Sequence, residues 1–383
     1  MGRPDGRANC FAMDSEIAIP TFYKRTHTED EPGTPWPSSS AVHRKCLQYA
    51  GKVPRQFRFI RCEVASEVAS HVDTIDWLLD SDPAIRWQAM RDLTDASPPA
   101  VAAERARVPH EGLGARILAH QGSDGSWHLT GAPDWLPTLF SFLLLRATGV
   151  DRADPAIESA VARLEAGYEW DEEFRDKPFK TFFEGEVEPC INGGVLALGA
   201  YFGRPTESLA RRLVGDQLDD GGWNCDAPKS TRSSFHSTIC VLEGLLEYER
   251  AVGSATEIAA ARRRGEEYIL KRFLFRRHST GEVASPAFLK FAFPPRYHYD
   301  VLRALDYLRD AGAQPDARIA DAVHVIESSQ QPDGRRLLDA AHDEALAFPF
   351  GESVGEPSGW NTLRALRVLR WYERRRLEPT SPA

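Results

Sequence analysis

The sequence predicts an all-α fold, in which repeated helical hairpins form a ring or a solenoid. Two observations support this prediction. A Gln-x-x-Asp-Gly signature occurs three times, at residues 121–127 and 217–223, and at 330–336 with Arg336 in place of the final Trp. Apolar segments with helical periodicity fill the intervals between these signatures. Repeats of this kind bury their apolar faces only against their neighbours, so the stacked assembly is the structural unit.

Five strongly apolar segments are expected to be inner helices, because few polar residues interrupt them. They span residues 137–148, 190–202, 236–250, 298–311 and 360–374. Four amphipathic segments lie between them and are expected to be outer helices with one face in solvent. These outer segments span residues 155–166, 206–217, 256–273 and 316–329.

The repeat region is predicted to begin near His71. Two short helices are expected there, and in the second Ser81 or Asp82 can cap the helix with Pro83 at its first position. Residues 1–70 are rich in Pro, Ser, Thr and mixed charge and read as a poorly ordered extension. The expected organisation is therefore an extension at 1–70, a helical domain at 71–375 and a tail at 376–383.

Composition narrows the classes of partner. The chain has 383 residues, 42% of them hydrophobic, and a formal net charge of −9. The negative charge disfavours a nucleic-acid partner. No apolar run is long enough to span a bilayer, and the first residues lack a secretory layout, so a cytoplasmic protein without a transmembrane segment is expected. The six cysteines are expected to be thiols, either in the core or bound to a metal.

The signature itself is expected to be structural. Its glycines permit a tight turn, its Asp can cap backbone amides, and its Gln and Trp can hold neighbouring repeats together. Asp124 and Asp220 are therefore not favoured as proton donors, and the loss of Trp at position 336 predicts a weaker last contact.

Alternation of inner and outer helices has a consequence for function. Successive inner helices run in the same direction, so their N-termini gather at one rim and residues distant in sequence become neighbours. Cys190, His236, His298 and Trp360 are expected at this rim, where helix N-termini carry partial positive charge.

The repeats resemble the Q-x-x-D-G-x-W repeats of the terpenoid cyclase and protein prenyltransferase superfamily. The blocks EPCINGGVLALGAYFG, SSFHSTICVLEGLLEYE and SGWNTLRALRVLRWY look like a bacterial squalene-cyclase-like subgroup of unassigned chemistry. The resemblance covers about residues 71–375 and implies an α/α toroid. Neither the D-x-D-D nor the D-C-T-A-E pattern of the cyclases is present, which disfavours polyene cyclisation started by protonation.

The prenyltransferase comparison implies a zinc site. In those β subunits an Asp-x-Cys and a His hold zinc at the starts of inner helices, and here Glu188-Pro189-Cys190 and the block around His236 match these positions. Cys225 and His298 complete a candidate set of Cys190, Cys225, His236 and His298, a combination of ligands that suits tetrahedral zinc. Each could instead be a buried thiol or a histidine bonded to a loop.

Further candidates are Glu188 or Asp300 as a replacement ligand, and Arg296 as a partner for a diphosphate or carboxylate. Aromatic side chains near the rim could line a pocket for an isoprenoid-like chain or pack the repeats.

The sequence thus favours a zinc-dependent enzyme acting on a hydrophobic or isoprenoid-like small molecule. Two alternatives remain open. One is a noncatalytic binding or scaffold protein with structural zinc or none, and the other is a prenyltransferase β-type subunit that needs a helical α-type partner.

Overall fold

The fold is taken from a computed structural model, which describes residues 73–168, 170, 181–253, 256–342 and 346–377. The chain divides into a unit of residues 1–71 and a unit of residues 72–383. The extension predicted at 1–70 and the tail from residue 378 lie outside the described residues. The helices described all belong to the second unit.

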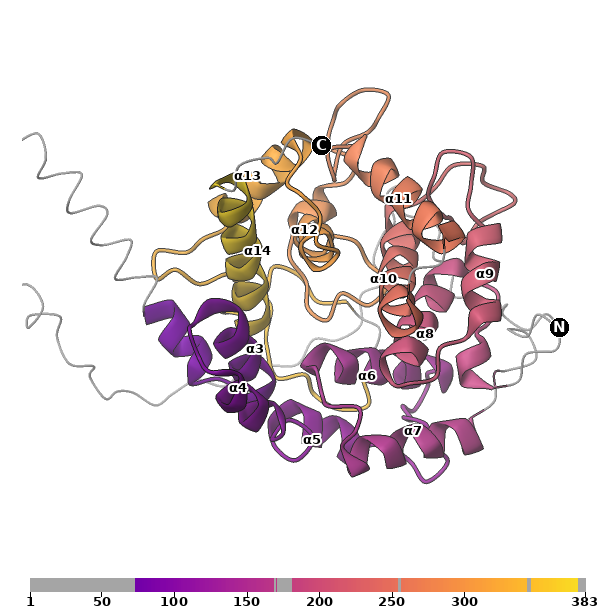
Figure 1. The fold of residues 1–383 in the computed structure, drawn as a ribbon, viewed down its shortest axis with the longest axis vertical. Coiled ribbons are helices and arrows are strands. Elements are labelled where there is room, and N and C mark those ends of the chain that lie inside the picture. Colours follow the sequence, from indigo (N-terminus) through magenta and orange to yellow (C-terminus); the bar gives the residue numbers. More distant parts are fainter. Residues whose placement is uncertain (1–72, 169, 171–180, 254–255, 343–345, 378–383) are drawn as a thin grey trace, which may run out of the picture. The chain divides into compact units, whose positions relative to one another are not determined.

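The predicted all-α fold is confirmed: the described residues contain helices joined by loops, with isolated β-bridges and no assigned strand. All five predicted inner segments are helices, and they lie on the inside in Figure 1. They are α6 (Trp135–Thr148), α8 (Pro189–Tyr201), α10 (Phe235–Val252), α12 (Val301–Asp310) and α14 (Gly359–Leu377).

The four predicted outer segments are also helices, and they pack outside the inner ones (Figure 1). They are α7 (Pro155–Gly167), α9 (Glu207–Gly215), α11 (Thr256–Leu270) and α13 (Ala320–Ser328). Short 3-10 turns precede or connect several helices: η3 (Phe182–Glu184), η4 (Pro286–Leu289) and η5 (Ala317–Ile319). Closure of these hairpins into an α/α toroid stays a prediction.

The start of the domain follows its capping chemistry. Residues 73–79 are helical, and α3 (Pro83–Leu93) begins after Asp82, whose carboxylate accepts the Ala84 amide at 2.9 Å. Pro83 fills the first position, where a missing N–H costs nothing. Two helices that the periodicity did not single out follow, α4 (Pro98–Arg105) and α5 (Gly112–Ala119).

The repeat signature joins each turn to the following outer helix. Gln121 donates to the carbonyl oxygens of Gly125 and of Ala160 in α7, and Gln217 makes the same pair of bonds to Gly221 and to Ala261 in α11. Gly125 has φ 87°, and a Cβ there would lie 2.4 Å from the α7 backbone, so only glycine fits.

The signature tryptophans anchor the turn to the helix before it. Trp127 and Trp223 are fully buried and donate to carbonyl oxygens ten residues earlier, those of Ile117 and Leu213. Arg336 is also fully buried, and its Nη2 lies 3.5 Å from the carbonyl oxygen of Ile326, which is again ten residues earlier. The arginine therefore takes the place of the tryptophan in the last repeat.

None of the helices in the described part of the chain combines the length and the hydropathy needed to cross a bilayer.

Candidate functional site

Helices α8 and α10 touch through their backbones, and this contact creates the site. A Cβ on Gly193 would lie 2.4 Å from the Cys240 carbonyl oxygen, and one on Gly244 would lie 2.4 Å from the Gly193 carbonyl oxygen. Small residues at both positions let the helices approach closely. Their N-termini, with Cys190 and His236 each at the second helical position, are thereby neighbours.

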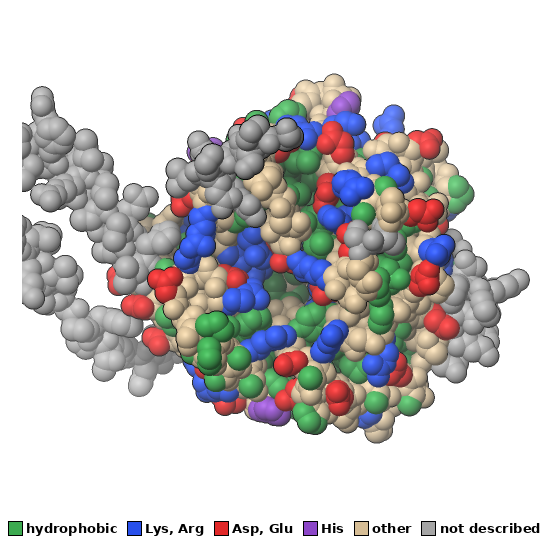
Figure 2. All heavy atoms as spheres, in the orientation of Figure 1, with side chains coloured by type: hydrophobic (Ala, Val, Ile, Leu, Met, Phe, Trp, Pro, Cys, Tyr) green, Lys and Arg blue, Asp and Glu red, His purple; other side chains and the backbone are tan. Residues whose placement is uncertain are grey.

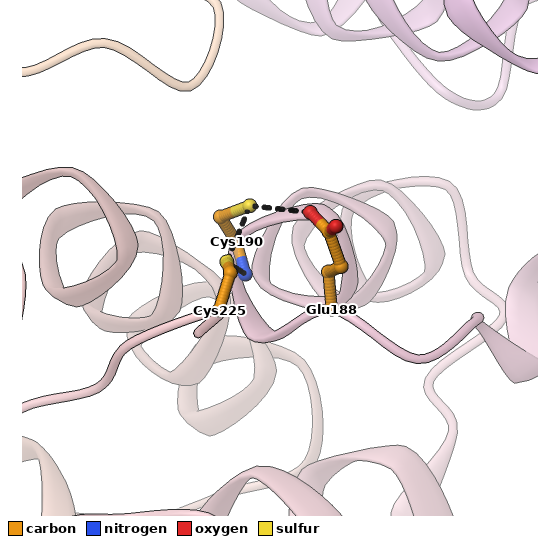
Figure 3. Close-up of side chains that lie close together, drawn as sticks. All are labelled: Glu188, Cys190 and Cys225. Carbon is orange, nitrogen blue, oxygen red and sulfur yellow. Dashed lines mark hydrogen bonds between the residues drawn. The ribbon is translucent and has the colours of Figure 1, made fainter. Parts of the chain in front are cut away.

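The thiols of Cys190 and Cys225 and the carboxylate of Glu188 converge at the start of α8 (Figure 3). One ligand atom from each residue lies within 4.8 Å of the others. The two sulfur atoms are 2.8 Å apart, and Cys190 Sγ lies 3.6 Å from Glu188 Oε2. Glu188 and Cys225 are half-buried, and Cys190 is buried.

The loop that carries Cys225 is held against α10. The Cys225 amide donates to Ser237 Oγ at 3.3 Å, and Asn224 donates to the Arg232 carbonyl oxygen at 2.6 Å. Cys225 Sγ also lies 3.2 Å from Ser237 Oγ, and it accepts the Cys190 amide at 3.4 Å. The fold thus fixes the position of this thiol before any ligand arrives.

His236 lies beside this cluster but is not part of the group within 4.8 Å. Its Nδ1 accepts the Tyr299 amide at 2.9 Å, so Nε2 is the nitrogen that could bind a metal. Burial, with smaller contributions from His298 and Arg303, lowers the pKa of His236 to about 4. The imidazole is neutral at pH 7, which is the form that ligates metals.

His298 is placed differently from the expectation that it starts an inner helix. Asp300 caps α12 by accepting the Arg303 amide at 2.7 Å, so the helix begins at Val301 and His298 lies in the preceding loop. The His298 ring stacks on His342 with centroids 3.6 Å apart, and it meets His236 edge-on at 5.8 Å. Sequence reasoning missed His342, which lies outside every repeat signature.

The remaining candidates, Asp300 and Arg296, have different roles. Asp300 is buried, and its oxygens accept the amides of Arg303 and Ala292, which makes it a helix cap. Arg296 is buried with a left-handed φ of 54°, and its guanidinium lies over the Phe140 ring at 4.9 Å. This conformation is uncommon for a non-glycine residue, and Phe273 and Leu274 adopt it as well.

A second buried carboxyl group, that of Glu186, lies next to the cluster. It accepts the Glu188 amide at 2.7 Å, and burial, reinforced by the negative charge of Glu188, raises its pKa to about 8. Sequence reasoning passed over Glu186 as part of an acidic run, since nothing in the pattern Glu-Gly-Glu-Val-Glu reveals which carboxylate is buried.

Cys190 lines a cavity of about 360 Å³ whose walls come from α3, α4, α6, α8, α10, α12 and α14 and from the loop at 293–297. Apolar side chains on its wall include Phe140, Ile191 and Leu246, and aromatic ones include Phe293 and Trp360. Of the aromatics that could line a pocket or pack the repeats, three are fully buried and pack the repeats: Trp127, Trp170 and Phe182.

The cavity is much more cationic than an apolar cup would be. Nine arginines line it against four carboxylates, although the whole chain carries a net charge of −9. Figure 2 shows Lys and Arg side chains around the hollow on this face. The arginines are Arg91, Arg105, Arg146, Arg250, Arg296, Arg303, Arg309, Arg364 and Arg367.

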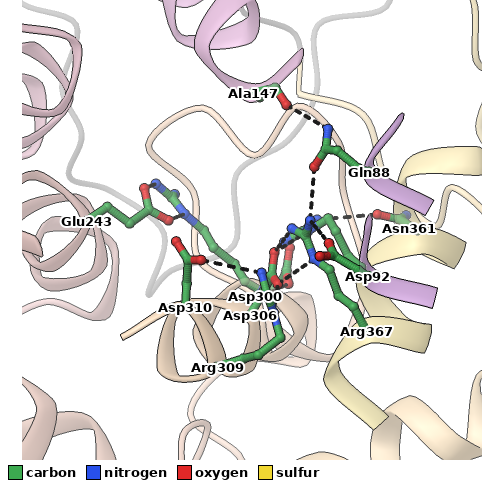
Figure 4. Close-up of polar contacts among 12 residues, drawn as sticks. Gln88, Asp92, Ala147, Glu243, Asp300, Asp306, Arg309, Asp310, Asn361 and Arg367 are labelled. Carbon is green, nitrogen blue, oxygen red and sulfur yellow. Dashed lines mark hydrogen bonds and ion pairs between the residues drawn. The ribbon is translucent and has the colours of Figure 1, made fainter. Parts of the chain in front are cut away.

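Many of these charges form a closed path of contacts, here called the polar circuit. Arg146 binds Glu247 at 2.7 Å, Arg250 lies 3.7 Å from Glu247 and 2.9 Å from Asp310, and Arg309 contacts Asp310 and Asp306. Arg367 binds Asp306 and Gln88, and Gln88 donates to the Ala147 carbonyl oxygen, next to Arg146 (Figure 4).

The sequence contains a signal for the polar circuit that is separate from the candidate metal ligands. Glu243, Glu247 and Arg250 recur at intervals of four and three, which places them on one face of the segment expected to be an inner helix. Charges on the buried side of an inner helix mark a polar cavity, because a packed core would exclude them.

Comparison with known proteins assigns the chain to no family. No protein family matches the chain, and no curated protein does. A solved structure described as that of a protein from Actinoplanes aligns with 80% of this chain and 99% of that chain, at 16% identity and a TM-score of 0.43. A likeness at this level supports no conclusion about fold or function.

Proposed function

We propose that this protein is a zinc-dependent enzyme of the prenyltransferase-like type, which binds an amphiphilic small molecule in its central cavity. The observation that carries the proposal is the convergence of Cys225 and Glu188 on Cys190, which lines that cavity. Two thiolates and a carboxylate suit zinc, and three protein ligands with a fourth position open are typical of a catalytic site.

The donor set, two thiols and a carboxylate, fits zinc in its chemistry. Zinc bound there would supply a Lewis acid and would lower the pKa of a coordinated thiol or water. The chain's own residues would orient the site: Ser237 and the Cys190 amide hold Cys225, and the Tyr299 amide holds the ring of the neighbouring His236. In a closed, structural version of the site, His236 Nε2 would be the fourth ligand.

The cavity wall favours a substrate with an apolar body and an anionic group. Phe140, Ile191 and Leu246 offer apolar surface, while the excess of arginines over carboxylates favours phosphate or carboxylate groups. This refines the purely hydrophobic substrate that the sequence predicts. Such a ligand can be sought by calorimetry, comparing farnesyl diphosphate with farnesol and with inorganic diphosphate. The proposal requires the first to bind more tightly than either part alone.

Metal content tests the zinc site. The purified full-length protein should contain about one zinc per chain, and the Cys190→Ser, Cys225→Ser double variant should contain almost none. Cys240→Ser is the matched control, because this thiol is buried and bonds to the Tyr297 carbonyl oxygen instead. Wild-type protein with less than about a tenth of an equivalent would rule the site out.

The number of protein ligands on the zinc then distinguishes an enzyme from a scaffold protein. X-ray absorption at the zinc edge should give two sulfur ligands, and His236→Ala should leave the spectrum unchanged if the fourth position is open. Loss of zinc in His236→Ala would instead indicate a closed site and favour the noncatalytic alternative. Co-purification with a helical partner would favour the prenyltransferase β-type alternative.

A further inference from the structure

Cys190 and Cys225 lie 35 positions apart in sequence, yet their sulfur atoms are 2.8 Å apart (Figure 3). We infer that these two cysteines form a redox-active pair, which a hydroperoxide converts into a disulfide. The pairing itself does not depend on bound metal. Its consequence, loss of the metal centre, rests on the proposed function.

The geometry requires little movement. A disulfide has an S–S bond of about 2.05 Å, so the sulfurs must approach by less than about 1 Å. Cys190 is anchored in the first turn of α8, and Cys225 is anchored through its amide to Ser237 in α10. Because α8 and α10 pack backbone to backbone at Gly193 and Gly244, the two thiols are held together in the reduced protein.

The contacts of Cys225 hold its sulfur in place. The sulfur accepts the Cys190 amide at 3.4 Å at the N-terminus of α8, and it lies 3.2 Å from the Ser237 hydroxyl. Cys225 is half-buried, whereas Cys190 is buried. Cys225, the more exposed residue, is therefore assigned as the thiol that a peroxide attacks first, and Cys190, which lines the cavity, is the resolving thiol.

Glu188 provides the proton acceptor for the second step, since Cys190 Sγ donates toward Glu188 Oε2 at 3.6 Å. The Cys225 sulfur first attacks the distal oxygen of the hydroperoxide. The O–O bond breaks, the departing oxygen takes the proton that the Cys225 thiol gives up and leaves as alcohol or water, and Cys225 becomes a sulfenic acid. The Cys190 thiol then passes its proton to Glu188 and attacks the Cys225 sulfur.

The S–OH bond breaks in this second step, and water leaves with the proton returned from Glu188. Two thiols and one hydroperoxide thus give one disulfide, one water and one alcohol or a second water. Both sulfurs are then withdrawn from metal binding, so oxidation would switch the proposed zinc centre off. Reduction by a dithiol would restore it.

Cys240 is an internal control for this chemistry. It is 3% exposed, and burial raises its pKa to about 12, so it stays protonated although Arg303 lies 3.6 Å away. A buried thiol of this kind reacts slowly with peroxide. Among the cysteines in the described part of the chain, Cys190 and Cys225 should therefore react with peroxide much faster than Cys240.

The test uses the full chain treated with one to a few equivalents of hydrogen peroxide, alkylated, digested and examined by mass spectrometry. The expected product is a linked peptide joining Cys190 to Cys225, which dithiothreitol reverses, while Cys240 remains alkylated. Peroxide-treated wild-type protein in which both thiols of the pair stay alkylated would overturn the inference.

Two variants sharpen the result. Cys190→Ser should stop Cys225 at the sulfenic acid, which dimedone traps, and Cys240→Ser should form the disulfide as the wild type does. Circular dichroism establishes that each variant is folded, and the wild-type measurement stands even if a variant fails to fold. Disulfide formation in a chain that never binds zinc would refute the metal centre alone, and bound zinc without disulfide formation would refute the redox pair alone.

Discussion

Arg336 occupies the position that tryptophan holds in the first two repeats. Its guanidinium reaches the carbonyl oxygens of Gly334 and Ile326, but its Nε is buried without a partner among the described residues. Burial lowers its pKa to about 10, because the charged form is disfavoured away from water. The last signature thus keeps the geometry of the other two with a less favourable side chain.

Replacing Arg336 with Trp should therefore stabilise the protein by roughly 1–2 kcal/mol, because an indole removes the buried charge and can donate to the same carbonyl oxygen. Thermal unfolding followed by circular dichroism measures the effect. The reciprocal change, Trp223→Arg, should destabilise the protein, because it introduces a buried charge at the equivalent site. If Arg336→Trp lowers Tm, the equivalence of the two positions is wrong.

Contact between α8 and α10 is the element on which the candidate site depends. It relies on two glycines that the sequence shows only as part of GG and EGLL. Neither has a turn conformation, so their role is close approach of two helices rather than backbone freedom.

Gly193→Ala should destabilise the protein by about 1–3 kcal/mol, because its Cβ would overlap the Cys240 carbonyl oxygen and force the helices apart. Zinc content should fall with stability, since Cys190 moves relative to Cys225. Chemical denaturation and metal analysis on the same samples check both effects. Gly215→Ala is the control: Gly215 ends α9, and nothing lies within 4 Å of the position that a Cβ would take there, so this change should be neutral or slightly stabilising.

The helices themselves were largely predictable, because periodicity and caps are local signals. Asp82 caps α3 before Pro83 as the sequence predicts, and the inner and outer helices fall within a few residues of their expected ranges. Cys190 and Cys225 were placed together in the candidate zinc set, whereas helix direction predicted only that Cys190 and His236 lie at the same rim. The stacking of His342 on His298 was not, because it depends on how a long loop folds back over the rim.

At the scale of the whole helical unit, the polar circuit links α6, α10, α12, α14 and α3 through side chains and the Ala147 carbonyl oxygen. Asp306 is its most connected member, bound by Arg309 and Arg367 and within 3.6 Å of Arg364. These three arginines come from two helices, so a single carboxylate ties α12 to α14. Such cross-helix pairing could not be read from the sequence, because it depends on the rotation of each helix about its own axis.

Asp306 makes the free energy of unfolding depend on pH in a defined direction. Burial alone would raise its pKa, but the charges of Arg367 and Arg309 outweigh burial and hold the pKa well below the ordinary value. A carboxylate with a depressed folded-state pKa contributes stability that is present above its unfolded-state pKa, near 3.9, and is lost as pH falls toward the folded value. The wild-type protein should therefore lose stability steeply below about pH 4.

Asp306→Asn should cost about 3–5 kcal/mol at pH 7, because it leaves buried arginines without their counter-charge, and it should flatten the loss of stability below pH 4. Urea denaturation at a series of pH values measures both the loss in free energy of unfolding at pH 7 and the change of that free energy with pH. Asp321→Asn is the control, since Asp321 pairs with Arg276 at the surface with 56% of its side chain exposed, where such a pair is worth about 0–1 kcal/mol. Equal losses in the two variants would show that the polar circuit does not hold the inner helices together. A loss confined to Asp306→Asn would show that the charges lining the cavity also stabilise its walls, so that a ligand bound among them must leave the bonds of Asp306 intact.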